Sequence, residues 1–115
     1  MSGFRTPESQ AEYERVLPEI LSHGCPLCTK QAVESFVHWK IVTDDFPYNK
    51  IAKLHHVLTP LRHVLERELN GEERQEYHDI KEEQLEGKYE YVIEPIGQHR
   101  SVPGHFHTHL IVSLD

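Results

Sequence analysis

The sequence predicts an α+β domain built on an antiparallel sheet of about four to five strands with two main helices. Two observations predict this class. Segments with the apolar spacing of a helix come before and between segments with the alternation of a strand, and the connections are short, without the rhythm of parallel crossover units. A chain of 115 residues is the size of one ordinary domain, so residues 1–115 are interpreted as a single unit.

The first predicted helix covers Glu8 to Ser22, where apolar residues recur at helical spacing. The preceding Thr6-Pro7 is typical of a helix start, and Gly24 is typical of a stop. Pro18 lies inside this segment, and because proline lacks a backbone N–H, we expect it to kink or split the helix.

The second predicted helix begins at about Glu66 or Glu72 and ends at Leu85. Asn70-Gly71 indicates its opening and Gly87 its end. Acidic residues dominate this segment and are interleaved with a few basic ones, which is the pattern of a solvated helix face.

Four strands are predicted, and their ranges are Phe36 to Thr43, Lys53 to Thr59, Tyr89 to Ile93 and His105 to Leu114. Alternation in the first strand places Val37, Trp39 and Ile41 on one face and His38 and Lys40 on the other. The segment between the first two strands, residues 44–49, is predicted to be a turn.

Composition excludes some classes of function. The formal net charge of −7 argues against binding to duplex nucleic acid, which needs a surplus of basic side chains, whereas a small phosphorylated ligand needs only a few local donors. No apolar run approaches the length of a membrane span, so no membrane partner is expected. The N-terminus lacks the apolar core of a signal peptide, and we expect a cytoplasmic protein.

The histidines of the last predicted strand are the most informative residues of the chain. Strand periodicity places His105, His107 and His109 on one face, while the other face carries Phe106, Thr108, Leu110, Val112 and Leu114 and is predicted to be core. Three adjacent imidazoles suggest a bound anion or metal. The alternatives are surface histidines on an edge strand, or a catalytic metal site in a cupin-like barrel.

The only two cysteines, Cys25 and Cys28, form a CxxC pair. In a reducing compartment such a pair is typical of a metal site or a redox site rather than of a structural disulfide. A tetrahedral zinc site needs two further ligands, and the spacing to the histidines does not fit a short zinc finger. Zinc binding, a thioredoxin-type redox pair and two incidental buried thiols all remain open from the spacing alone.

Three motifs together resemble the histidine-triad (HIT) superfamily of nucleotide hydrolases and transferases. The segment from His105 to Ile111 is similar to the triad His-φ-His-φ-His-φ-φ, with Thr108 at a position that is usually apolar. The segment from His55 to His63 resembles the family's strand and turn before it. Asp44 to Pro47 is similar to the family's D-x-x-P turn, and Asp-Phe-Pro also resembles the galactose-1-phosphate uridylyltransferase branch. The resemblance implies a HIT-like fold.

For cofactors and partners, the resemblance implies one structural zinc ion, a nucleotide ligand and a homodimer. In zinc-containing members the metal is held by a CxxC pair, a histidine after the turn and the first triad histidine. Carried onto this sequence, the implied ligands are Cys25, Cys28, His63 and His105.

The resemblance also implies a covalent mechanism. The second triad histidine, His107 here, attacks the α-phosphorus of a nucleotide and forms a nucleotidyl-histidine. His109 donates to the phosphate oxygens or to the leaving group, and His55 supports the triad. The implied activity is therefore nucleotide hydrolysis or nucleotidyl transfer.

Several positions depart from the family pattern. Glu94 stands where the family has an asparagine, and Leu61 stands where it has a lysine. The segment before the triad places Ser101 at a position often occupied by glutamine, and it contains Arg100, Ser101 and Gly104, which are candidates for binding phosphate. The departures favour an alternative function, namely a zinc-stabilised nucleotide-binding or interaction module without turnover.

Overall fold

The structure is a computed structural model, and it describes residues 3–96, 102 and 104–114. Its elements are α1 (Pro7–Ser22), α2 (Pro26–Thr29), β1 (Glu34–Ser35), β2 (Trp39–Thr43), β3 (Ala52–Pro60), the 3₁₀ turn η1 (Glu66–Glu68), α3 (Gly71–Asp79), the π-helical turn η2 (Ile80–Gln84), β4 (Tyr91–Ile93) and β5 (Thr108–Ser113). The five strands form one antiparallel sheet in the order β1-β2-β3-β5-β4. The predicted α+β class with an antiparallel sheet and two main helices is confirmed.

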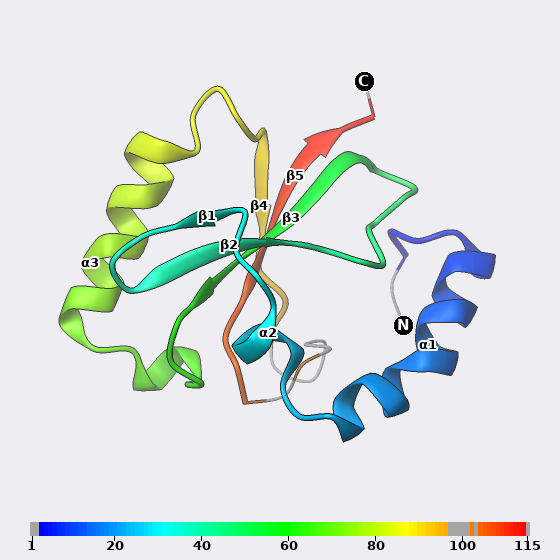
Figure 1. Ribbon diagram of the computed structural model, residues 1–115. Helices are drawn as coiled ribbons and strands as arrows, with labels where there is room; N and C mark the ends of the chain where they lie inside the picture. Colours follow the sequence, from blue (N-terminus) through cyan, green and yellow to red (C-terminus); the bar gives the residue numbers. More distant parts are fainter. Residues whose placement is uncertain (1–2, 97–101, 103, 115) are drawn as a thin grey trace.

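The sheet separates two layers of different character (Figure 1). On the side of α3 it carries the main core, in which Trp39 stacks on Tyr77 with ring centroids 4.8 Å apart and meets Phe106 edge-on at 6.1 Å. On the side of α1 and α2, smaller clusters form around Val42 and Val57 and around Ile111. This second side is less filled by apolar side chains, and the histidines of the triad lie there.

The first helix follows the prediction at both ends. Thr6 is its N-cap, and its hydroxyl accepts a hydrogen bond of 3.3 Å from the backbone N–H of Ser9. The helix runs unbroken through Pro18, so the expectation of a split is wrong. No residue of α1 is buried, and the carbonyl that Pro18 leaves without an intrahelical donor can therefore bond to water.

The second helix begins later than Glu66. Asn70 caps it by accepting a bond of 2.8 Å from the N–H of Glu73, and the Glu73 carboxylate in turn accepts from the N–H of Asn70 at 2.9 Å. This capping box sets the start at Gly71, and the residues from Glu66 form only a 3₁₀ turn.

The strand predicted from Phe36 begins only at Trp39, and Val37 is 73% exposed rather than on the inward face. The backbone N–H groups of Val37 and His38 donate to the carboxylate of Glu76 on α3, at 3.1 and 2.6 Å. Because these two donors bond to a helix side chain, they are not available to a strand ladder.

The strand predicted from His105 begins only at Thr108, so His105 and His107 precede β5. The ladder with β3 ends at the pair Leu58 and Thr108. Beyond it, Pro60 has no N–H to donate, and the N–H of Phe106 bonds to the carbonyl of Val64 at 2.8 Å instead. The predicted core face holds for Phe106 and Leu110, which lie in the main core, but it is wrong for Leu114, which is 53% exposed. No described helix is long and apolar enough to cross a membrane.

Candidate functional site

Four side chains from distant parts of the chain converge beside the end of β3, namely Cys25, Cys28, His63 and His105. The Nδ1 atom of His105 lies 3.4 Å from the sulfur of Cys25 and 3.4 Å from that of Cys28. The Nδ1 atom of His63 lies 3.3 Å from the sulfur of Cys28. The four donor atoms all lie within 4.8 Å of one another, so the structure forms a compact Cys2His2 group.

These separations suit a tetrahedral metal ion. Zinc bonds of about 2.3 Å to sulfur and about 2.0 to 2.1 Å to nitrogen place adjacent tetrahedral ligands about 3.6 Å apart. The observed sulfur-to-nitrogen distances of 3.3 to 3.4 Å are close to that span. Burial and the neighbouring Cys25 thiol raise the pKa of Cys28, and a dication is the kind of charge that would keep both thiols as thiolates.

His105 is oriented for this role by its other ring nitrogen. Nε2 lies 2.9 Å from the carbonyl oxygen of Pro60, which can only accept, so Nε2 carries the proton and Nδ1 presents its lone pair to the cysteines. The cysteines are set by local structure. Cys25 is the N-cap of α2 and Cys28 lies in its single turn, so both thiols face the same side.

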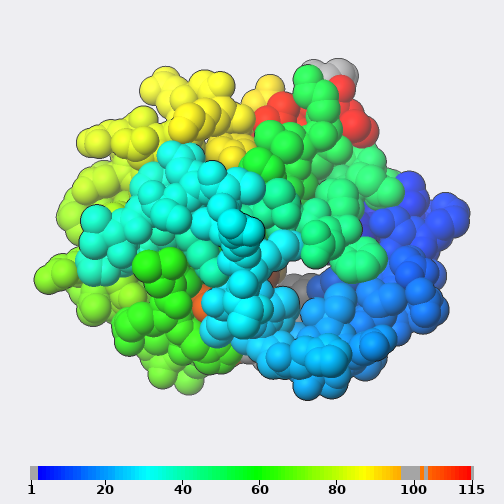
Figure 2. Space-filling view, viewed as in Figure 1, coloured from blue at the N-terminus to red at the C-terminus, as the bar shows by residue number. Residues whose placement is uncertain are grey.

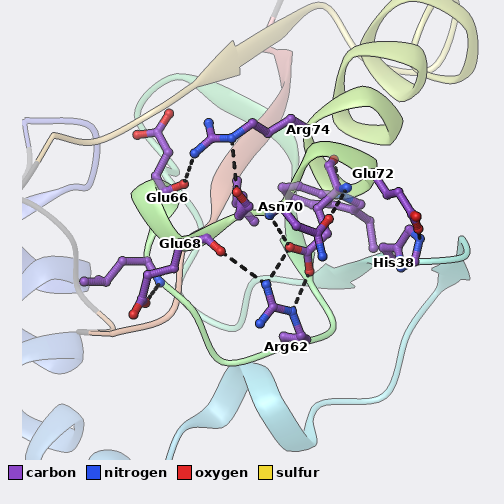
Figure 3. A network of polar contacts seen from close by, with 11 residues as sticks. His38, Arg62, Glu66, Glu68, Asn70, Glu72 and Arg74 are labelled. Carbon is purple, nitrogen blue, oxygen red and sulfur yellow. Dashed lines mark hydrogen bonds and ion pairs between the residues drawn. The ribbon is translucent and has the colours of Figure 1, made fainter.

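The fourth member of this group, His63, is exposed, and its neighbour Arg62 anchors the loop that carries it. Arg62 donates from Nε and Nη2 to the buried carboxylate of Glu73, at 2.9 and 2.7 Å, and from Nη2 to the carbonyl of Glu68 at 3.2 Å. Figure 3 shows this network around Arg62, Glu68 and Asn70. The loop that carries His63 is thereby joined to the start of α3.

Gly104, predicted as a phosphate-binding residue, lies against His63. Its φ of +80° is a left-handed conformation, and a Cβ at this position would lie 3.0 Å from the Nε2 atom of His63. Glycine therefore suits this position, because it adopts the positive φ readily and has no Cβ to crowd the His63 ring. The other two predicted phosphate-binding residues, Arg100 and Ser101, lie outside the described residues.

His107 is buried, and a contact with the backbone indicates which of its ring nitrogens carries the proton. Its Nδ1 atom lies 3.1 Å from the carbonyl oxygen of His105. Because a carbonyl accepts only, Nδ1 carries the proton in the neutral ring, and Nε2 carries the lone pair. The first triad residue thus fixes the tautomer of the second.

His55 and His109, which come from adjacent strands, are joined by a contact of 2.7 Å between Nε2 of His55 and Nδ1 of His109. The N–H of Tyr48 donates to Nδ1 of His55 at 3.0 Å, so His55 carries its proton on Nε2 and donates to His109. Nε2 of His109 lies 3.2 Å from the hydroxyl of Tyr48, and Asp44 lies 3.5 Å from Nε2 of His55. Both ring nitrogens of His109 therefore have protein partners.

The electrostatics of this group keep the two histidines neutral. Burial, followed by the charge of Arg5, lowers the pKa of His55 to about 3. Burial, followed by the nearby rings of His107 and His55, lowers the pKa of His109 to about 2. Burial also raises the pKa of the Tyr48 phenol to about 12. Near neutral pH, His55, His109 and Tyr48 are therefore uncharged donors and acceptors.

A cavity of about 60 Å³ adjoins the triad, and its lining includes His107, His109, Asp44 and Arg5. It meets a second, more apolar cavity of about 90 Å³ under α1. Both cavities are lined by Tyr13, Leu27, Asp44, Val57 and Val102. Figure 2 shows the surface hollowed between α1 and the turn that follows β2. These cavities lie on the sparsely filled side of the sheet.

Sequence reasoning missed two residues of this site. Arg5 and Tyr48 lie in an N-terminal segment and a turn, without any periodicity or motif that would indicate burial. Tyr48 directly follows the Asp44 to Pro47 turn, which already resembled a family motif. Its position next to that motif was the sequence feature that could have indicated its place in the site.

The comparisons with known proteins identify no relative. No family model matches the chain, and no curated protein and no solved structure matches it either.

Proposed function

We propose that this protein is a HIT-like nucleotide hydrolase or nucleotidyl transferase that acts at the α-phosphate through a covalent adduct on His107. The observation that supports the proposal most directly is the hydrogen bond between Nδ1 of His107 and the His105 carbonyl. It leaves the lone pair on Nε2, and neutral imidazole is nucleophilic near pH 7.

The reaction has two displacements. In the first, the Nε2 lone pair forms a bond to the α-phosphorus, the bond from phosphorus to the leaving group breaks, and the leaving group departs with that electron pair and takes up a proton. In the second, water or another acceptor attacks the same phosphorus, loses a proton, and the phosphorus–nitrogen bond breaks to restore neutral His107. The His105 carbonyl stabilises the imidazolium character of the adduct through the Nδ1–H.

We propose zinc as the ion of the Cys2His2 group, with a structural role. The group has four protein ligands, which is the closed coordination of structural sites. Cys25, Cys28, His63 and His105 would hold the ion and fix His105, whose carbonyl orients His107. Zinc would thus contribute stability and preorganisation, while His107 performs the displacement.

The two cavities suggest how a nucleotide is divided between them. The smaller cavity contains the polar groups His107 and Arg5, and its size suits a phosphoryl group. The larger cavity is lined by Leu17, Ile20 and Phe46 and suits an apolar or aromatic moiety such as a nucleobase. Neutral His109 would donate from Nε2 to the leaving group or phosphate if the contact between that atom and the Tyr48 hydroxyl were broken.

The alternative is a zinc-stabilised nucleotide-binding module without turnover. One observation favours it, namely that both ring nitrogens of His109 already have partners in His55 and Tyr48. A module needs only the cavities and the bound nucleotide, without a donor to the leaving group.

Trapping the adduct distinguishes the two functions. The protein is mixed with adenosine 5′-phosphoramidate, quenched in alkaline denaturant and analysed by mass spectrometry for added nucleotidyl mass. We expect the adduct on wild type, its loss in His107→Gly, and a fall in turnover of at least about a thousandfold, or about 4 kcal/mol. His56→Ala is the matched control, because His56 lies on the same strand as His55 and bonds to Tyr89 away from the triad.

The enzyme proposal fails if wild type binds AMP but forms no adduct with phosphoramidates, dinucleoside polyphosphates or nucleotide sugars, and His107→Gly binds AMP equally well. That result would support the binding module.

A further inference from the structure

Arg5 is a buried cation in a segment that precedes the first helix. Only 6% of its surface is exposed. Its Nε donates to the carbonyl of Phe46 at 2.7 Å, and its Nη1 donates to the side-chain oxygen of Gln10 at 3.0 Å. Its guanidinium carbon lies 4.3 Å from the ring centre of Tyr13 and 5.0 Å from that of Tyr48. Two neutral acceptors and two aromatic rings therefore surround the charge.

No carboxylate of the described residues forms an ion pair with Arg5. Asp44 lines the same cavity without forming an ion pair with Arg5; burial raises the pKa of its carboxyl, and the charge of Arg5 opposes that shift. A buried cation normally has an anionic partner, because cation–π contacts and neutral acceptors offset its desolvation only in part. Among the described residues, the guanidinium of Arg5 thus has no carboxylate as a hydrogen-bond or ion-pair partner.

The position of Arg5 indicates where an anion could contact its guanidinium. Arg5, His107 and His109 line one cavity of about 60 Å³. The charge of Arg5 also contributes to the lowered pKa of His55 and of His109, so its field reaches the triad. A tetrahedral oxyanion fits this space, whereas an entire nucleotide does not.

We propose that Arg5 is the anion-binding residue of the triad cavity and that its guanidinium binds the phosphate that His107 faces. The inference rests on the proposed function for the identity of the phosphate as that of a nucleotide. A planar guanidinium bonds to two oxygens of one phosphate, and Nη2 has no described hydrogen-bond partner within the protein. Arg5 would bind the phosphate in the ground state and stabilise the charge that develops on its oxygens in the transition state.

The test measures equilibrium binding of inorganic phosphate, without any chemical step. Ring resonances of the histidines are followed by NMR during a phosphate titration of wild type, Arg5→Met, Arg5→Gln and Arg5→Lys. Arg5→Gln keeps a donor for the Phe46 carbonyl while it removes the charge and the Nη1 donor to Gln10. Arg15→Met is the matched control, because Arg15 is an exposed arginine of α1 that pairs with Glu12.

We expect saturable shifts of the His107 and His109 rings in wild type and in Arg15→Met. Binding should weaken at least about tenfold in Arg5→Met and Arg5→Gln, and less in Arg5→Lys, which keeps the charge. Phosphate should raise the Tm of wild type, and this increase should disappear in the two neutral variants. A residue with a structural role alone would lower the Tm equally with and without phosphate.

Two outcomes overturn the inference. One is phosphate binding in a folded neutral variant, either Arg5→Met or Arg5→Gln, that equals binding in wild type. The other is the absence of saturable shifts in wild type. Failure of the proposed function looks different, because phosphate would still bind through Arg5 while no adduct forms on His107. Conversely, an adduct that forms at an unchanged rate in Arg5→Gln would support the enzyme proposal and would rule out this role of Arg5.

Discussion

His63→Ala tests the proposed metal site more cleanly than a change at the buried His105. The His63 ring is exposed, whereas His105 is 1% exposed and its removal would also create a cavity in the interior. Without a metal, truncating an exposed histidine changes stability by no more than about 0.5 kcal/mol. With a metal, the same change removes one of four ligands, and the binding free energy of a structural ion is folding free energy.

The size of the effect follows from mass action. Loss of an outer partner of a ligand lowers metal affinity about 10- to 100-fold, and loss of a ligand itself should cost about a thousandfold. At a fixed free zinc concentration, a thousandfold loss lowers the free energy of unfolding by about 4 kcal/mol. For 115 residues the unfolding entropy is about 0.24 kcal/mol/K, so Tm should fall by about 15 to 20 °C.

The assay is thermal unfolding with buffered zinc and again with a chelator, together with metal analysis of the purified proteins. His78→Ala is the matched control, since His78 is also exposed and makes only long contacts of 3.6 and 3.9 Å to acidic neighbours. We expect about one zinc per wild-type chain, and a Tm deficit of His63→Ala in zinc that disappears with chelator. The same Tm for His63→Ala and His78→Ala in zinc would refute the metal site.

Two further predictions concern the surroundings of this centre and the triad. Gly104→Ala should lower zinc affinity, because the new Cβ would lie 3.0 Å from Nε2 of His63. Gly87→Ala is the control, because Gly87 has a φ of +82° with open space around it, so this change should introduce only backbone strain. Competitive zinc titration compares the two variants, and equal zinc affinities would contradict the steric argument. His55→Gln should reduce the loss of stability in acid. The folded pKa of His55 is lowered from 6.5 to about 3, so its contribution is complete above pH 6.5 and is lost at about 1.4 kcal/mol per pH unit as pH falls toward 3. Urea unfolding between pH 7 and 4 in chelator measures this slope, with the exposed His23→Gln as control, and an unchanged slope in His55→Gln would contradict the burial argument.

Local chemistry accounts for the features that the sequence predicted correctly. Thr6 and Asn70 mark helix starts because a side-chain oxygen can satisfy the N–H three residues later, whatever the rest of the chain does. The face of Phe106 and Leu110 was predictable because strand alternation depends only on backbone geometry. The CxxC pair likewise lies in one turn, with its thiols on one side.

The two histidines of the Cys2His2 group and the polar contacts of the triad depended on contacts between distant segments. Spacing left the partners of the CxxC pair open, and the family resemblance implied His63 and His105, which the structure brings to the cysteines across 35 to 80 residues. The late start of β5 was not predictable from alternation, because it depends on Pro60 of another strand and on the carbonyl of Val64.

By itself, the sequence determined the α+β class, the helix caps, the alternation of faces and the residue types available for metal and phosphoryl chemistry. Only the tertiary structure decided that Arg5 is buried beside the triad, that Tyr48 bonds to His109, and that Lys40 is buried with its Nζ donating to the Lys30 carbonyl at 2.8 Å. Burial of a charged or polar side chain follows no local period. It depends on which acceptors and rings the folded chain collects around that side chain, and these come from segments far apart in sequence.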